Sequence, residues 1–251
     1  MHDLRADRLG AVIFDKDGVL VDFERTWTPA IRAAALEFAD GDRHRALNLL
    51  RKVGFDEASG KFMPDSIWAA GTNADLIDAW VEDASPARRK FLIERMAAHC
   101  EATIPVPAVP AEHMRRSMKE LKKRGLKLAL VSNDTTASAK GAAEHFGLAD
   151  LFDFICGFDA VANPKPAADP VLAFHAACGV PAECMAVIGD NAHDAHMARA
   201  AGCALFIGVL SGNADKEHLA PLSDHVVPDV LEAIAQILAQ ADAMQRARFM
   251  P

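Results

Sequence analysis

The 251-residue sequence lacks several features that would assign a protein to a class at once. No stretch of about 18 residues is apolar and free of charge, so we expect no membrane-spanning helix. The first ten residues, MHDLRADRLG, lack the apolar run that a secretory signal peptide needs, and we therefore expect a cytoplasmic protein. The sequence also contains no internal repeat and no low-complexity tract.

Cysteines are few, and positive charge is outweighed by negative charge. The five cysteines form no CxxC pair, and their odd number and mostly apolar surroundings favour buried thiols in a reducing compartment. A net charge of -8 argues against a non-specific nucleic-acid binder, because such a protein needs a basic face. A small phosphorylated substrate remains compatible, since a metal ion and one lysine can supply positive charge locally.

Short apolar runs recur along the chain and alternate with helical patterns. The runs have the length and composition of strands buried on both faces, and they lie at residues 11–14, 126–131, 154–156, 185–188 and 204–207. The helical patterns between them lie at about 111–124, 135–147, 167–178 and 192–201. This alternation predicts an α/β fold with an open parallel sheet covered by helices on both faces.

The segment after the first strand interrupts the alternation. Residues 22–105 show helical periodicity and no convincing strand, with a loop-like stretch at 54–71. Three prolines in IPVPAVP then suit a stiff extended linker. We therefore predict a core formed by residues 1–21 and 106–251 and an all-α insertion of residues 22–105. Residues 229–246 repeat apolar positions at helical spacing, which predicts an amphipathic helix packed on the core or on a neighbouring subunit.

The sequence DKDG follows directly on the first apolar run. Asp15 and Asp17 lie two positions apart, so on a strand both would point beyond the carboxyl end of the sheet, where open α/β folds bind ligands. Gly18 allows the chain to turn sharply there. Neighbouring carboxylates repel unless they share a cation or a proton, which allows one to act as base and the other as acid. A plain solvated turn is the alternative interpretation.

A second apolar run leads into the sequence GDNAHD, in which Asp190 and Asp194 lie four positions apart. If a helix begins directly after this run, both carboxylates face the same region as Asp15. Three carboxylates suit Mg²⁺, which prefers oxygen ligands and also contacts substrate phosphate. His193 and His196 are expected to face solvent or neighbouring side chains, because no cysteine or further histidine completes a zinc site.

Two further motifs carry groups that bind phosphate. Ser132 and Asn133 follow another apolar run and can donate hydrogen bonds to phosphate oxygens, helped by the start of the next helix. Alternatively, Ser132 or Asp134 only caps that helix. Lys165 stands between two prolines, whose restrained backbone suits an ammonium aimed at a transferring phosphate. A solvated loop lysine is the alternative.

In chain order, the DxDG acids, the helical insertion, the strand-end serine, the lysine and the GDxxxD acids resemble the haloacid dehalogenase-like hydrolase superfamily. The resemblance covers nearly the whole chain. It is greatest to the branch that has a helical cap after the first motif, which includes phosphoglycolate phosphatases and β-phosphoglucomutases. It implies a Rossmann-like core, a mobile α-helical cap and Mg²⁺ as the cofactor.

The resemblance also implies a role for each matched residue. Asp15 corresponds to the nucleophile and Asp17 to the general acid and base, while Lys165 would steady the nucleophile and the charge on the phosphate. The implied substrate-binding residues are Ser132, Asn133 and Gly18. The implied magnesium ligands are Asp15, Asp190, the main-chain oxygen of Asp17, and Asp194 acting directly or through water.

Together these features predict a magnesium-dependent phosphatase that acts on a small phosphorylated metabolite through an aspartyl-phosphate. Three alternatives stay open. A phosphomutase would need a second phosphate site in the cap. A haloacid dehalogenase is disfavoured by Asp17, because that branch lacks an acid at this position. A non-catalytic sensor of phosphorylated metabolites would be expected to have decayed motifs, and here all four are intact.

Overall fold

The computed structural model describes residues 9–63 and 66–247. The chain divides into two compact units. One unit contains the residues up to Asp22 together with those from Pro107 onward, and the other is Phe23–Val106. We refer to these as the core and the insertion and describe each by itself.

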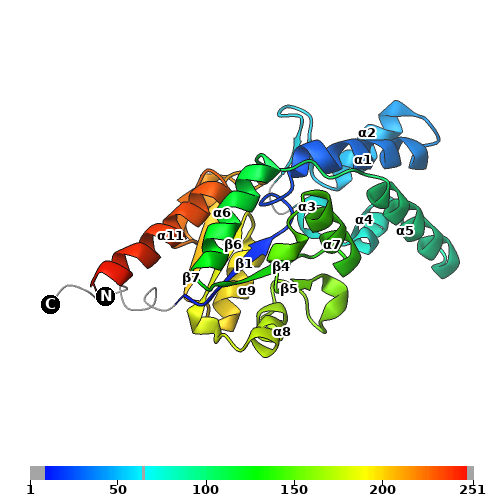
Figure 1. The fold of residues 1–251 in the computed structure, drawn as a ribbon. Helices are drawn as coiled ribbons and strands as arrows, with labels where there is room; N and C mark the ends of the chain where they lie inside the picture. Colours follow the sequence, from blue (N-terminus) through cyan, green and yellow to red (C-terminus); the bar gives the residue numbers. More distant parts are fainter. Residues whose placement is uncertain (1–8, 64–65, 248–251) are drawn as a thin grey trace. The chain divides into compact units, whose positions relative to one another are not determined.

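The core contains a six-stranded sheet in which all neighbouring strands are parallel, in the order β5-β4-β1-β6-β7-β8 (Figure 1). The strands are β1 (Ala11–Asp15), β4 (Lys127–Val131), β5 (Phe154–Cys156), β6 (Met185–Gly189), β7 (Leu205–Val209) and β8 (His225–Val227). The predicted α/β fold with a parallel sheet is therefore confirmed. The chain runs outward from β1 through β4 to β5 and then returns to β6 on the other side of β1.

The strands carry apolar side chains on both faces of this sheet, so helices cover both faces. In β1, Val12 and Phe14 pack in a cluster with residues of α6 (Ala111–Lys123), α7 (Thr136–His145) and α11 (Val230–Ala247). Ala11 and Ile13 point to the other face, where they pack with residues of α8 (Asp169–Cys178) and α9 (Ala192–Ala201). Figure 1 shows α6 and α11 together on one side of the sheet. This period-2 alternation explains why the strands read as continuous apolar runs.

In its described residues, the insertion contains five α-helices and has a hydrophobic cluster of its own. The helices are α1 (Phe23–Phe38), α2 (Arg43–Lys52), α3 (Ile67–Ala70), α4 (Asn73–Trp80) and α5 (Pro86–Glu101). Its most buried large side chains include Ile31, Ile77 and Met96, each 0% exposed. A unit with such a cluster has its own packed interior.

The prediction that the insertion is entirely helical is wrong at one place. The stretch expected to be a loop contains an antiparallel hairpin of β2 (Phe55–Asp56) and β3 (Lys61–Phe62). The carboxylate of Asp56 closes its turn by accepting hydrogen bonds from the main chain of residues 58 and 59. Strands of two residues are too short to show an alternating pattern, which is why the sequence did not indicate them.

The sixth strand of the core, β8, was not predicted either. It has three residues, and only Val227 is fully buried. The run is therefore too short to show the apolar pattern of a strand buried on both faces. In the described part of the chain, no helix has the length and apolarity needed to cross a membrane.

Candidate active site

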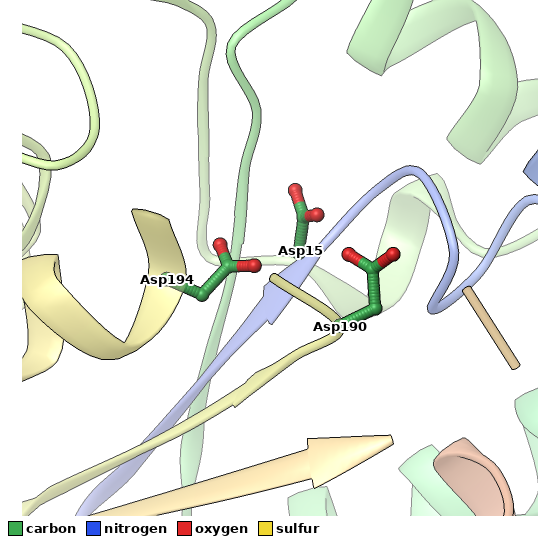
Figure 2. A group of neighbouring side chains, drawn as sticks. All are labelled: Asp15, Asp190 and Asp194. Atoms are coloured by element: carbon green, nitrogen blue, oxygen red, sulfur yellow. The ribbon is translucent and has the colours of Figure 1, made fainter. Parts of the chain in front are cut away.

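Three acidic side chains converge at the carboxyl end of the central strands (Figure 2). Asp15 is the last residue of β1, Asp190 follows β6 directly, and Asp194 lies in the first turn of α9. One carboxylate oxygen from each lies within 4.8 Å of the others, and all three residues are buried. Among the residues that the structure describes, this is the single group of three or more acidic, histidine or cysteine side chains able to hold a metal ion.

Strand pairing and helix capping place these carboxylates. β1 and β6 are parallel neighbours with Phe14 opposite Ile188, so the residues that follow them emerge side by side. Asn191 caps α9, and the carboxylate of Asp194 accepts a hydrogen bond from the main-chain N–H of Asn191 at 3.3 Å. A Cβ on Gly189 would lie 2.3 Å from the Cβ of Asp194, so only glycine allows this approach.

Lys165 lies against two of the three acids. Its Nζ is 2.7 Å from Oδ1 of Asp15 and 2.7 Å from Oδ1 of Asp194, and its side chain is 5% exposed. The solvated-loop alternative is therefore excluded. The side-chain amide of Asn133 donates a hydrogen bond to the main-chain oxygen of Lys165 at 3.0 Å, which ties the lysine's loop to the end of β4.

Burial dominates the electrostatics of the cluster. It raises the pKa of Asp190 well above its ordinary value, and the charges of Asp15 and Asp194 raise it further. Burial also raises the pKa of Asp15 to about 6, the nearby Asp194 adding to this and Lys165 opposing it. For Lys165 burial works against the charged form, but the two carboxylates outweigh it and raise its pKa. The three buried carboxylates thus lie close to the ammonium of Lys165, which contacts two of them.

The excess of negative charge in this cluster bears on whether the residues fit a metal ion. Carboxylates whose pKa is raised by burial and mutual repulsion are stabilised by an added cation. The donor set consists of oxygen atoms alone, which suits a hard divalent ion. The residues present therefore fit a divalent cation. His193 and His196 are outside the group, as expected.

The loop after β7 also contacts Asp190, and its part in the site was not predicted from the sequence. The main-chain N–H of Asn213 donates to Oδ2 of Asp190 at 3.1 Å, and the hydroxyl of Ser211 donates to the main-chain oxygen of Gly18 at 2.7 Å. A Cβ on Gly212 would lie 1.8 Å from Oδ2 of Asp190, and one on Gly18 would lie 2.2 Å from it. The sequence does contain a signal for this loop, because Ser211, Gly212 and Asn213 follow an apolar run, as the other motifs do.

Ser132 and Asn133 lie at the end of β4, beside the strand that carries Asp15. Ser132 is 4% exposed, and its hydroxyl accepts a hydrogen bond from the main-chain N–H of Asp134 at 3.0 Å. The buried Oδ1 atom of Asn133 has no hydrogen-bond partner within the described residues. Neither Ser132 nor Asp134 caps α7, because Thr135 does so.

Asp17 does not join the three acids. β1 ends at Asp15, so the strand alternation that would send both carboxylates to one side does not extend to Asp17. Gly18 has φ +76°, and its N–H donates to the main-chain oxygen of Val21 at 2.8 Å, so the chain turns at once. The Asp17 carboxylate lies 3.1 Å from the Nζ of Lys16 and is 24% exposed. The carboxylate of Asp17 is therefore outside the group of three acids that could hold a metal ion.

Comparisons with known proteins agree with this geometry. Residues 9–202 match the haloacid dehalogenase-like hydrolase family. The chain therefore belongs to this family, as the motifs predicted, and is an enzyme of the hydrolase class. A relative from Chromobacterium violaceum, named phosphoglycolate phosphatase, is 34% identical over 212 residues, which cover 83% of this chain and 88% of that protein.

Further similar proteins have lower sequence identity to this chain. The probable phosphatase IndB of Dickeya dadantii is 28% identical over 227 residues, covering 89% of this chain and 90% of that protein. A solved structure of a predicted phosphoglycolate phosphatase from Haemophilus somnus has a TM-score of 0.68 at 18% identity, over 91% of this chain and 97% of its own. A putative β-phosphoglucomutase from Thermotoga maritima has a TM-score of 0.61 at 25% identity, over 92% and 98%.

Proposed function

We propose that this enzyme is a magnesium-dependent phosphatase that hydrolyses a small phosphorylated metabolite through an aspartyl-phosphate on Asp15. The observation that carries the proposal is the placement of Asp15, a buried carboxylate held by Lys165 and next to two further acids. The relatives named phosphatases support the reaction, and those named phosphoglycolate phosphatases support a small phosphorylated acid as the substrate.

The metal ligands of the proposal are the carboxylates of Asp15, Asp190 and Asp194 and the main-chain oxygen of Asp17. When bound, Mg²⁺ neutralises negative charge on the phosphate and on the attacking carboxylate. Lys165 contributes a second positive charge at the nucleophile, so that two anions can approach each other. Ser132 and Asn133 donate hydrogen bonds to the phosphate oxygens, and Gly18 is the third substrate-binding residue of the proposal.

Two steps at the phosphorus atom complete the reaction. A carboxylate oxygen of Asp15 attacks phosphorus, the bond to the substrate's ester oxygen breaks, and Asp17 donates its proton to that oxygen. Asp17, now anionic, takes a proton from water, whose oxygen attacks the phosphoryl group and releases the Asp15 carboxylate and inorganic phosphate. Each step moves one proton through Asp17, which ends in its starting state.

A screen of phosphorylated metabolites with and without Mg²⁺ tests the proposed function. We expect release of inorganic phosphate from a small phosphorylated acid or a sugar phosphate, a fall of more than about 100-fold on chelation, and recovery on adding Mg²⁺, since the metal offsets several kcal/mol of charge repulsion. Undiminished activity in excess chelator would contradict the metal assignment. Absence of phosphate release across the panel would contradict the phosphatase.

Further assays separate the other candidate functions. A phosphomutase, supported by the likeness to the putative β-phosphoglucomutase, would return the phosphoryl group to a sugar phosphate and be strongly activated by a sugar bisphosphate. A dehalogenase would release halide from a haloacid without magnesium. A non-catalytic sensor would bind a phosphorylated metabolite without turning it over.

Replacing Gly212 with alanine is expected to weaken magnesium binding without abolishing folding. The new Cβ would overlap Oδ2 of Asp190, so this carboxylate must move. Loss of a metal ligand's orientation costs about 10–100-fold in affinity. Magnesium titrations of activity measure the change, and Gly141→Ala in α7 is the matched control because its Cβ would meet nothing within 4 Å. Equal magnesium requirements in the two variants would refute the steric argument.

A further inference from the structure

The core contains a second buried ammonium, which the proposed mechanism does not use. Lys16 is 1% exposed although it directly follows the nucleophile in the chain. Its Nζ lies 2.7 Å from Oδ2 of Asp134, 3.1 Å from Oδ2 of Asp17 and 3.3 Å from the hydroxyl of Ser138. Lysine is rarely this buried unless it is paired, and here two carboxylates pair with it.

Each end of this network is fixed by further hydrogen bonds. The main-chain oxygen of Lys16 accepts hydrogen bonds from the N–H groups of Leu20 and Val21, both at 2.9 Å, which closes the turn after β1. Asp134 accepts hydrogen bonds from the N–H of Thr135 at 2.7 Å and the hydroxyl of Ser138 at 2.6 Å. The ammonium therefore joins the turn after β1 to the turn after β4.

We propose that Lys16 is a positioning residue, whose buried ammonium holds the carboxylate of Asp17 in place by anchoring it to Asp134 at the start of α7. The proposal rests on the proposed function in one respect, that Asp17 is the general acid and base. Asp17 lies beyond the end of β1 and directly before the turn at Gly18, so the strand does not fix its side chain. The pair with Lys16 constrains the position of its carboxylate. A displacement of about 1 Å in a catalytic group can cost about 100-fold in rate.

The test compares two substrates whose leaving groups need protonation by Asp17 to different degrees. An alkyl phosphate has a poor leaving group and needs protonation, whereas p-nitrophenyl phosphate has a good one and needs little. In Lys16→Met, we expect kcat/KM for the best alkyl phosphate of the screen to fall about 10- to 100-fold more than kcat/KM for p-nitrophenyl phosphate. Lys16→Arg keeps the charge on a longer, planar group, so we expect a selective loss of intermediate size.

Two reference variants make the result specific. Asp17→Asn should show the largest selective loss, because it removes the acid itself. Lys122→Met removes a lysine that pairs with Asp153 at the opposite end of β4, and its ratio of the two kcat/KM values should equal that of the wild type. If Lys16→Met does not fold, Lys16→Arg decides the matter by the same ratio.

The outcomes separate this proposal from the proposed function. If Asp17→Asn shows the selective loss and the folded Lys16 variants lose activity equally on both substrates, or not at all, the positioning role of Lys16 is overturned and the phosphatase mechanism stands. If Asp17→Asn itself shows no selective loss, the assignment of Asp17 as the acid fails, and the role of Lys16 fails with it.

Discussion

Asp15→Asn is expected to lower phosphatase turnover by about 10⁴-fold or more, because the amide removes the nucleophile and catalytic groups that act as a unit lose nearly all function together. The fold should survive the change. Asparagine has nearly the same shape as aspartate, and Asp194 still pairs with Lys165. Turnover of the best substrate of the screen and the thermal unfolding midpoint, both measured with and without Mg²⁺, check the prediction.

The stability of this variant is as informative as its activity. In the metal-free wild type, the pKa of Asp15 is raised from 3.8 to about 6, so the native state holds a proton that the unfolded chain releases. The free energy of unfolding should therefore fall as pH rises from about 4 to 6. Asp15→Asn should lack this contribution. Asp215→Asn, a change at the exposed cap of α10 (Lys216–Leu219), serves as the control and should keep it. Turnover near the wild-type value would contradict the nucleophile assignment.

Lys165→Met has the second largest expected effect, and it should reduce activity and stability together. Removing the ammonium leaves Asp15 and Asp194 without this partner of opposite charge, next to the third buried carboxylate, Asp190. Breaking one member out of a buried ion pair costs about 3–5 kcal/mol. For a chain of this size each kcal/mol lowers the unfolding midpoint by about 2–4 °C, so we expect a fall of roughly 6–20 °C. Turnover should fall by about 10²–10³-fold, as for the loss of one group that stabilises the transition state.

The response to Mg²⁺ distinguishes an electrostatic role from loss of packing. The carboxylates of Lys165→Met repel one another without relief, so added Mg²⁺ should raise its unfolding midpoint more than that of the wild type. Lys122→Met provides the control, because Asp153 keeps its pair with Lys127. A Mg²⁺ response equal to that of the wild type would show that Lys165 acts through packing alone.

The sequence predicted those parts of the fold that show as continuous apolar runs. The runs that became β1, β4 and β6 bury both faces, and their apolar character could be recognised without knowing their neighbours. In the hairpin of the insertion, the side chain and the main-chain oxygen of Asp56 both accept hydrogen bonds that close a turn between strands of two residues. Such a turn leaves no periodic signal.

The candidate site was predictable where chemistry follows directly on a strand. Asp15 and Asp190 were chosen for this reason and Lys165 because it stands between two prolines, and the structure brings the three together. Gly212 escaped notice because its contribution is the absence of a Cβ beside Asp190, which becomes visible only when the two segments are neighbours. The burial of Lys16 was not predicted for a related reason, because it depends on the pair with Asp134, which is distant in the sequence.

The insertion leaves and rejoins the core at adjoining points. Val21 forms a bridge with Pro107, and the N–H of Ala108 donates to the main-chain oxygen of Leu20 at 3.0 Å. Because the two junctions touch, the core constrains only the distance between the ends of the inserted segment and not its length or shape. Replacing the entire segment at this seam would leave Asp15, Asp190 and Asp194 in place, because all three carboxylates belong to the core.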